Sequence, residues 1–366
     1  MNSVCDGRVE LTELDRVSCT PAERRDFAIR RGDILFNRTN SFALVGKSAV
    51  VADDADVVFA SYLVRLRVKE LADFRYVGHW FCCAPAQSRM KQLATLGVSQ
   101  CNINPTALRR DLSIPLPPKR VQRKVADILG TWDEALEKLD ALIAAKERRK
   151  KALMQQLLTG KRRFHEHKAS PWRKLQISKV LRCVFRPVQV NEDASLDLVS
   201  LRRRCGGLFR RPQVVASEYK TQDLHALMAG DFLVSKRQVV HGAWALVGPE
   251  FAGALVSKEY SILINHAPDV FETRFFAWLC KTPRMIHLTR VASTGVHLEK
   301  LIFDSDVFLR EVIRIPSVLA EQAAVADILD AADAELRLLR KQREAFDLQK
   351  RGLMQQLLTG RVRVNA

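Results

Sequence analysis

Polar and basic side chains gather in five short stretches whose chemistry suits hydrogen bonding to nucleic acid. Arg and Lys bind phosphates or guanine, whereas Asn and Gln match the edge of adenine. The stretches are NRTNS, SQCNIN, RRR, FRR and SKRQ, which begin at residues 37, 99, 202, 209 and 235. We predict that DNA is contacted by Asn37, Arg38, Thr39, Asn40, Ser41, Ser99, Gln100, Asn102, Arg202, Arg203, Arg204, Arg210, Arg211, Lys236, Arg237 and Gln238.

Any single stretch could be an ordinary solvated loop. The charge of the whole chain, however, supports contact with DNA. The chain has 59 Lys+Arg against 41 Asp+Glu and a formal net charge of +18. Such a surplus favours a polyanionic partner, and double-stranded DNA is the first candidate. A generic basic protein and a protein on an anionic membrane surface are the alternatives. No apolar run approaches the ~20 residues needed to cross a bilayer, so we expect a cytoplasmic protein without a membrane partner.

Patterns that would carry catalysis or bind a metal are weak. The stretch VGKS at residues 45–48 has Ser41 where a phosphate-binding loop needs its first glycine. The HEH stretch at residues 165–167 is too closely spaced for a helical metal pair. No Asn-Pro-Pro-aromatic tetrad of a DNA amino-methyltransferase is found, and the eight cysteines contain no CxxC pair. We therefore predict no catalytic residue, no metal site and no cofactor in this chain.

The elements that must position the polar stretches are organised by an internal repeat. The octapeptide LMQQLLTG occurs at residues 153–160 and again at residues 353–360. When residues 125–160 are placed on residues 325–360, 18 of the 36 positions are identical. Upstream, RGDILFNRTNSFALVGK from residue 31 resembles AGDFLVSKRQVVHGAWALVGP from residue 229, and we align their shared ALVG. The chain is thus predicted to be a tandem of two related units.

The repeated tail has the apolar period of a long amphipathic helix. Between Pro118 and Gly160 only Gly130 is a potential breaker, so about 40 residues would form a helix roughly 60 Å long. A helix of this length buries its apolar stripe best against the second copy, as a coiled coil. The residues predicted to pair the helices or to dock a partner are Val125, Ile128, Trp132, Leu136, Leu139, Leu157, Val325, Ile328, Leu336, Leu339, Phe346 and Leu357.

Two like units associate most simply through a pseudo-two-fold axis, which would make the two helices antiparallel. The globular parts contain strand-like runs such as DILF, ALVG and SAVVA in the first and DFLVS, ALVG and SILI in the second. Each ends in one helical stretch. The predicted fold class is therefore α+β, with two pseudo-symmetric α/β domains separated by two long antiparallel coiled-coil helices.

PLPP, VADIL and LMQQLLTGKRR follow one another in the first unit, and VADIL and LMQQLLTG recur in the second. This arrangement resembles the specificity (S) subunit of a Type I restriction-modification system. The resemblance implies target recognition domains at residues 1–113 and 164–314 and spacer helices at residues 114–163 and 315–366. It also implies recognition of a split DNA site and docking of methylation (M) subunits, two copies by family analogy, and of restriction (R) subunits. Catalysis and its cofactors, S-adenosylmethionine, ATP and Mg²⁺, would then belong to those partners.

The first unit departs from the second at its start. The second opens with WRKLQISKVL from Trp172, whereas only 31 residues precede Gly32 and none of them match this opening. We expect the first domain to lack its opening strand; a misassigned start, a truncated chain and a minimal domain would each explain this. The second helix also begins with PSVL in place of PLPP, although Glu321 and Gln322 keep the usual following pair.

Two other functions remain compatible with the sequence. The chain could be a coiled-coil adaptor that binds proteins and touches DNA through charge alone. It could also be a self-contained DNA methyltransferase or nuclease, against which the missing motifs argue. Sequence-specific binding to a split site separates the first function from both alternatives.

Overall fold

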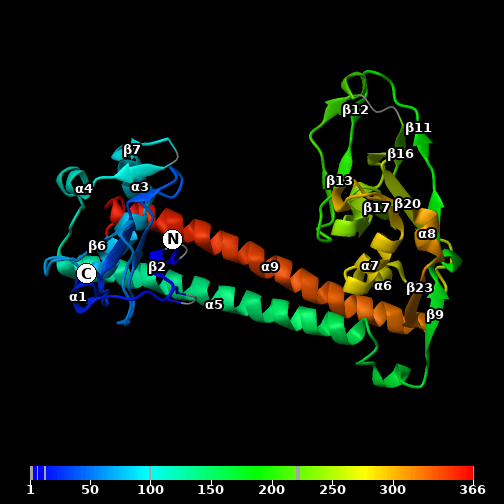
Figure 1. Ribbon diagram of the computed structural model, residues 1–366, viewed down its shortest axis with the longest axis horizontal. Helices are drawn as coiled ribbons and strands as arrows, with labels where there is room; N and C mark the ends of the chain where they lie inside the picture. The colour runs from blue at the N-terminus through cyan, green and yellow to red at the C-terminus, as the bar shows by residue number, and fades with distance from the viewer. Residues whose placement is uncertain (1–2, 6, 12–13, 99, 220–222, 366) are drawn as a thin grey trace. The chain divides into compact units, whose positions relative to one another are not determined.

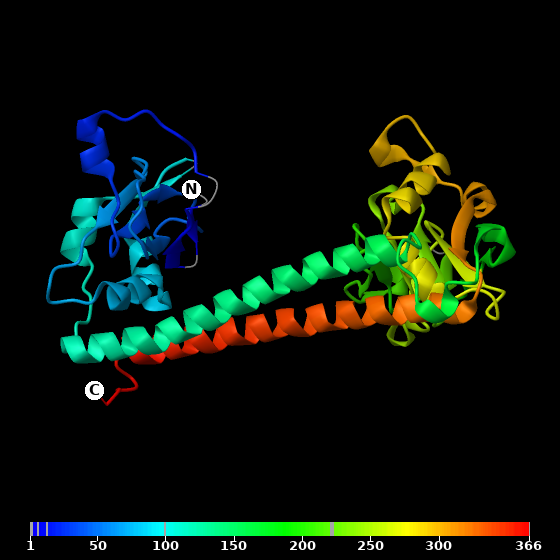
Figure 2. The same ribbon diagram turned by 90° about the horizontal axis from the view of Figure 1, so that it is seen from below.

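The computed structural model describes residues 3–365 except residues 6, 12–13, 99 and 220–222. The chain forms two compact units, one of residues 1–143 with 338–366 and the other of residues 144–337. Each unit consists of a mixed helix-and-strand domain packed on one segment of each of two long helices (Figures 1 and 2). The predicted α+β class is confirmed. The compact units cut across the predicted spacer segments, because each helix segment shares a core with its domain.

The two long helices are α5 (Lys119–Leu157) and α9 (Leu319–Leu358), as the repeat predicted. Ion pairs show their direction within each unit. In the first unit Asp133 pairs with Lys350 at 2.5 Å and Asp140 with Arg343 at 3.0 Å. In the second, Lys146 pairs with Glu335 at 2.5 Å and Lys150 pairs with Asp333. Because the numbers rise along α5 as they fall along α9, the helices are antiparallel in both units.

The buried face of the helices differs in detail from the predicted stripe. Val125, Leu136, Leu157, Val325 and Leu357 are buried as expected. Leu139 and Leu336 are buried too, while Ile128, Leu339, Phe346 and Trp132 are half-buried, the last two in ring contact at 5.7 Å. Ile328 lies outside the buried face, with 36% of its surface exposed, and the adjacent Leu329 is 0% exposed. The face is rotated because each helix start packs against both its domain and the other helix.

The first unit is built on a five-stranded sheet of order β1-β2-β5-β3-β6, beside a small sheet of order β4-β8-β7. Its elements are β1 (Val4–Cys5), β2 (Gly7–Val9), α1 (Pro21–Phe27), β3 (Ile34–Asn37), β4 (Thr39–Asn40), β5 (Ser48–Val50), β6 (Leu63–Leu66), α2 (Phe74–Cys82), α3 (Ala84–Gln92), β7 (Ala94–Leu96), β8 (Cys101–Ile103) and α4 (Pro105–Asp111).

The second unit is built on an antiparallel sheet of order β10-β20-β17-β18, with small sheets around it. Its elements are β9 (Trp172–Gln176), β10 (Leu181–Val184), β11 (Pro187–Val188), β12 (Ser195–Leu196), β13 (Val199–Leu201), β14 (Leu208–Arg210), β15 (Val214–Val215), β16 (Leu224–Ala226), β17 (Phe232–Ser235), β18 (Trp244–Leu246), β19 (Leu255–Ser257), β20 (Tyr260–Asn265), α6 (Thr273–Leu279), α7 (Pro283–Val291), β21 (Ser293–Thr294), β22 (Ile302–Phe303), α8 (Ser305–Arg310) and β23 (Val312–Pro316). The short 3-10 helices are η1 (His165–His167), η2 (Ile177–Lys179), η3 (Ala216–Glu218), η4 (Val239–His241), η5 (Pro249–Phe251) and η6 (Leu298–Lys300).

The central strands of the two units are equivalent, but not in the register that the shared ALVG suggested. ALVG at residues 43–46 is a turn, whereas ALVG at residues 245–248 begins in β18. The structural match runs from Gly46 to Gly242, which have left-handed φ values of +87° and +77°. After these glycines, β5 pairs with β3 as β18 pairs with β17. The ALVG alignment is therefore wrong, because the turn glycines fix the register.

β9, β10 and β23 of the second unit have no counterpart among the described strands of the first. β9 pairs antiparallel with β23, and β10 pairs antiparallel with β20. In the first unit, residues 112–116 form no strand and β6, the counterpart of β20, is the last described strand of its sheet. The buried aspartate at the turn before the central strand is paired differently as a result. Arg186, just after β10, pairs with Asp231 in the second unit, whereas Arg67 pairs with Asp33 at 2.9 Å in the first.

The single helical stretch predicted at the end of each globular part is two helices in the structure. α2 and α3 are separated at Cys83, and α6 and α7 are separated between Leu279 and Pro283. Pro85 and Pro283 stand in the first turns of α3 and α7, where the missing N–H costs nothing. Among the described residues, no helix is both long and apolar enough to cross a membrane.

Adjacent residues on α9 provide a test of the buried face. Leu329→Ala should lower the free energy of unfolding by about 2–5 kcal/mol, because a fully buried leucine leaves a cavity. Ile328→Ala should cost much less, since that side chain is partly exposed. Denaturant unfolding of the full chain measures both. Equal losses would show that the assigned face is incorrect.

Candidate nucleic-acid interface

A buried glutamine near the start of each long helix joins that helix to its domain. In the first unit Gln122 accepts a hydrogen bond from Asp73 N at 2.8 Å and donates to Pro117 O at 2.7 Å. In the second, Gln322 accepts from Glu272 N at 3.0 Å and donates to Pro316 O at 3.0 Å. Both side chains are buried, so losing either would leave unpaired backbone groups. The amide therefore fixes the domain on the helix at equivalent places.

An arginine close to each glutamine repeats the same connection at the surface. Arg75 on α2 donates to Asp127 on α5 at 2.7 Å, and Arg274 on α6 donates to Asp327 on α9 at 2.7 Å. Each arginine also pairs with the residue that caps its helix, Asp73 or Glu272. The two domains are thus held on their helices by the same set of contacts.

In the first unit the predicted contact residues converge on the small β4-β8-β7 sheet. Thr39 lies opposite Asn102 in β8, and its hydroxyl donates to the Asn102 amide oxygen at 3.0 Å. Asn40 accepts from Ser41 N, and Gln100 and Asn102 are exposed. These residues come from stretches 60 positions apart in the chain.

Two predicted residues of the first unit, Asn37 and Arg38, lie differently. Asn37 is buried at the end of β3, with 2% of its surface exposed, so its side chain belongs to the interior. Arg38 is half-buried, and its Nε finds no hydrogen-bond partner among the described residues. Ser99 lies outside the described residues.

In the second unit two predicted stretches lie side by side. Arg202, Arg203 and Arg204 form the turn of the β13–β14 hairpin, and Arg204 N donates to His241 O at 2.7 Å in η4, next to Gln238. Glu299 ties this turn to η6, because it accepts from Arg203 at 3.0 Å and lies 3.2 Å from His241. Arg202 stacks on Phe209 at 4.6 Å. Arg237 pairs with Glu259, and Gln238 Oε1 is buried without a described partner.

Arg210 and Arg211 are not part of this group. Arg210 is the last residue of the second strand of the hairpin and Arg211 follows it, at the end away from Arg202–Arg204. Arg210 pairs with Asp197 at 3.0 Å and stacks on Phe251, while Arg211 contacts the ring and hydroxyl of Tyr219. These contacts support the local fold, so DNA contact by the pair remains a prediction for a separate surface.

The same backbone hydrogen bond places one basic residue in each unit. Ile103 N in β8 donates to Arg38 O at 2.8 Å, and Phe303 N in β22 donates to Lys236 O at 2.8 Å. Arg38 N likewise donates to Tyr62 O, as Lys236 N does to Glu259 O. Arg38 and Lys236 are therefore equivalent residues, each directly after the central strand and beside a β-hairpin.

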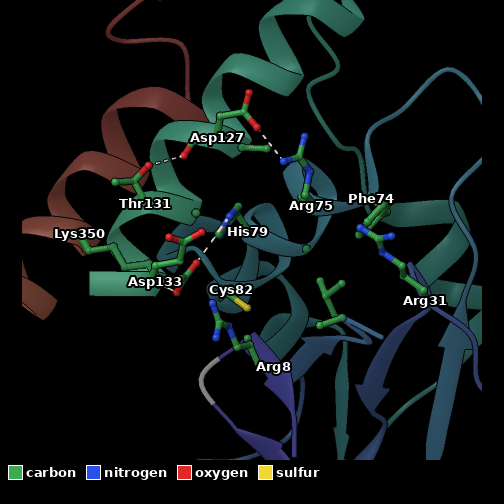
Figure 3. A pocket seen from close by; sticks show the side chains of 17 residues that line it. Arg8, Arg31, Phe74, Arg75, His79, Cys82, Asp127, Thr131, Asp133 and Lys350 are labelled. Carbon is green, nitrogen blue, oxygen red and sulfur yellow. Dashed lines mark hydrogen bonds and ion pairs between the residues drawn. The ribbon is translucent and has the colours of Figure 1, made fainter. Parts of the chain in front are cut away.

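A charged pocket of about 540 Å³ lies in the first unit between α2, α5 and the strands β2 and β5 (Figure 3). His79, Cys82, Asp127 and Asp133 line it, with Lys350 from α9. The second unit fills the equivalent place. There Trp278 stands in place of His79, and its indole donates to Asp330 on α9 at 2.8 Å. The residue of α5 that matches Asp330 is Gly130.

The electrostatics of the pocket keep its histidine neutral. Burial lowers the pKa of His79 to about 4, and the nearby Lys350, Arg75 and Arg8 act in the same direction against the attraction of Asp133. His79 lies 3.8 Å from Asp133, which Lys350 already neutralises at 2.5 Å. Burial alone would raise the pKa of Asp333 in the second unit, but Lys150 lowers it. The carboxylates on the helices therefore act as ion-pair partners.

Sequence reasoning missed most of the residues that hold the domains on the helices. Gln122 and Gln322 stand 200 positions apart, and Asp73 and Arg75 match Glu272 and Arg274. The internal repeat could have identified all of them, had it been extended from residue 125 back to the helical stretches before each long helix. Glu299 could not have been found in this way, because the matching hairpin tip of the first unit, residues 97–102, contains no charged residue.

Comparison with known proteins agrees with this arrangement. Over its whole length the chain is 26% identical to a Methanocaldococcus jannaschii protein described as the specificity subunit of type I restriction enzyme MjaX, 86% of which is covered. Residues 20–147 match the family model described as the Type I restriction modification DNA specificity domain. The chain is thus similar to proteins of this family.

Two further proteins are similar to this chain over much of its length. The MjaVIII specificity subunit of the same organism is 22% identical over 69% of this chain and 63% of its own length. The crystal structure of a Type I restriction-modification S subunit from M. genitalium matches 91% of this chain and 84% of its own, with 15% identity and a TM-score of 0.59. That similarity supports the fold.

The buried His79 gives the first unit a predictable response to acid. The pKa of His79 in the folded chain, about 4, lies below the ordinary histidine value of 6.5, so between pH 4 and pH 6.5 the unfolded chain binds the proton more readily. Stability should fall by up to roughly 3 kcal/mol as the pH drops from 6.5 to 4. His79→Gln should reduce this loss, while His266→Gln at an exposed position should not. Denaturant unfolding at several pH values measures these losses. The same acid response in the original chain and in both variants would refute the assignment of the lowered pKa to His79.

Proposed function

We propose that this chain is the DNA sequence-recognition subunit of a Type I restriction-modification complex, and that each unit recognises one half of a split duplex site. The observation that carries the proposal is the repeated placement of Arg38 and Lys236. Each lies at the start of a surface with hydrogen-bonding side chains, from Thr39 and Asn102 in one unit and from Arg203 and Gln238 in the other. Such surfaces suit base edges and phosphates.

Unsatisfied polar atoms at these surfaces support the same conclusion. Arg38 Nε and Gln238 Oε1 are buried and find no partner among the described residues. Buried polar groups are normally hydrogen-bonded, so an unpaired one beside a candidate interface is consistent with a ligand that completes it. The net charge of +18 adds a sequence-independent attraction that weakens as salt is raised.

The chain itself is proposed to be non-catalytic, with methylation and restriction supplied by partner subunits. S-adenosylmethionine would then bind the methylation subunits, two of which are expected, while ATP and Mg²⁺ would be bound by partner subunits. The antiparallel α5 and α9 would set the gap between half-sites. Leu338 and Leu348 on α9 are strongly exposed, which supports docking of a partner on the helices.

Selection of duplexes from a random library by the full chain, alone and with its methylation subunit, tests the main proposal. A split consensus is expected, and its methylation in cells should depend on this chain. Equal binding of random and selected duplexes by the assembled complex would instead favour an adaptor that contacts DNA through charge. Methyl transfer by the isolated chain would favour a self-contained enzyme.

Replacement of the two equivalent basic residues should affect different halves of the site. Arg38→Gln should weaken discrimination in one half-site and Lys236→Gln in the other, each by about 10-fold or more, because a base contact contributes ~1–3 kcal/mol. The control Lys341→Gln removes the same charge from an exposed position on α9. Competition binding with half-site variants measures the effect. If all three variants lost affinity equally for every duplex, the two residues would contribute charge alone.

Docking on the helices can be tested at the exposed leucines. Leu338→Asp combined with Leu348→Asp should reduce co-purification with the methylation subunit at least about tenfold, since a charge in an apolar interface is costly. Leu71→Asp, at another strongly exposed leucine, is the matched control. Unchanged unfolding would show that the fold is intact. Full co-purification of the double variant would place the docking surface elsewhere.

A further inference from the structure

Both units carry a β-hairpin with an exposed Gly-Val dipeptide at its tip. Gly97-Val98 connects β7 to β8, and Gly295-Val296 lies between β21 and β22. We propose that each hairpin tip enters the major groove of its half-site and that Val98 and Val296 contact thymine methyl groups there. The inference rests on the proposed function and assigns two further specificity-determining residues to it.

The backbone of each turn requires its glycine, but nothing in the fold requires a valine at the next position. A Cβ at Gly97 would lie 2.7 Å from Gln100 O, and one at Gly295 would lie 2.8 Å from Lys300 O, so both turns need glycine. Val98 and Val296 are 110% and 90% exposed and therefore contribute almost no packing. The domains have otherwise diverged widely in sequence. Counted from the matched pairs of Ala94 with Ile103 and Ser293 with Phe303, the two valines stand one position apart, but each directly follows the glycine of its hairpin turn. An exposed β-branched apolar residue next to this glycine in both units points to a contact outside the chain.

The hairpin tips belong to the same surfaces as the candidate base contacts. The backbone bonds from Ile103 to Arg38 and from Phe303 to Lys236 attach each hairpin directly to the basic residue of its unit. In the first unit β8 also pairs with β4, which brings Asn102 beside Thr39. In the second, the hairpin connection contains Glu299, which contacts Arg203 and His241. Each valine is thus presented together with polar side chains.

Further apolar side chains surround the tips. Leu96 and Phe42 are exposed in the first unit, as are Leu298 and Ile302 in the second. Isolated exposed apolar residues are common, but here they gather around an equivalent hairpin in each unit. Cations accompany them, for Lys91 lies 5.7 Å from the Phe42 ring centroid and Lys300 lies in η6. A protruding apolar tip with cations around it fits a polyanion that also offers apolar surface.

Duplex DNA presents such surface in its major groove. The groove is about 12 Å wide and admits a two-stranded β-ribbon, and thymine is the base that carries a methyl group there. The two methyls of valine can pack against this group while the neighbouring polar side chains bind base edges and phosphates. An apolar pocket on a partner protein is the competing occupant, and the experiment below separates the two.

The test combines valine truncation with removal of the thymine methyl. The full chain, with its methylation subunit if assembly requires it, is measured on the duplex that it selects from a random library. Each thymine in the two half-sites is replaced in turn by deoxyuracil, which lacks only the methyl group. For the original chain, one replacement in each half-site should weaken binding about fourfold, as expected for ~0.8 kcal/mol per methyl-sized group.

The variants assign each contact to its valine. Val98→Ala should abolish the deoxyuracil effect in one half-site and Val296→Ala in the other, while the control Val17→Ala, at an exposed position outside both hairpins, should abolish neither. A deoxyuracil effect that persists in both variants, or the absence of one in the original chain, overturns the inference. Loss of partner binding without any DNA effect also overturns it. Failure of the original chain to select any sequence would instead refute the proposed function.

Discussion

The structure depends on how each domain is fixed to a helix that extends beyond its own unit. A single buried amide, Gln122 or Gln322, accepts from the backbone at the start of one domain helix and donates to the proline carbonyl that precedes the long helix. Because both backbone groups are shielded from water, rotation of the domain would leave them unpaired. The surface arginines at 2.7 Å from the helix aspartates act in the same sense. Sequence-specific DNA contacts require such fixed geometry, since hydrogen bonds to base edges tolerate little displacement.

Within this shared frame the two units are not copies. The second fills the space between α6 and α9 with Trp278, whereas the first leaves a charged pocket around a neutral histidine. In the second unit β10 pairs with the outer edge of β20, whereas the equivalent strand β6 is the last described strand of its sheet in the first. Divergence is therefore concentrated in the periphery, while the contacts to the helices are retained.

The sequence was sufficient for the long helices, because their apolar period and the repeated octapeptide are local signals that packing did not override. It also placed the central strands, the α+β class and the basic character. It failed where a side chain's neighbour lies far along the chain. Ile328 and Leu329 are adjacent and similarly apolar, and their burial depends on the angle between two packed helices. The polar character of Asn37 suggested a surface role, but it lies at the buried end of β3. The shared ALVG gave the wrong register because identical residues were aligned, whereas the register is set by the left-handed glycines Gly46 and Gly242.

The different partners of Asp33 and Asp231 have a practical meaning for exchanging segments between units. Each carboxylate is almost fully buried, but its guanidinium partner is Arg67, directly after β6, in the first unit and Arg186, two residues after β10, in the second. A chimera that transplants residues 224–265 without Arg186 would bury an uncompensated charge, since β20 has isoleucines at the places of Arg65 and Arg67. The smallest portable recognition module of the second unit must therefore begin no later than Arg186.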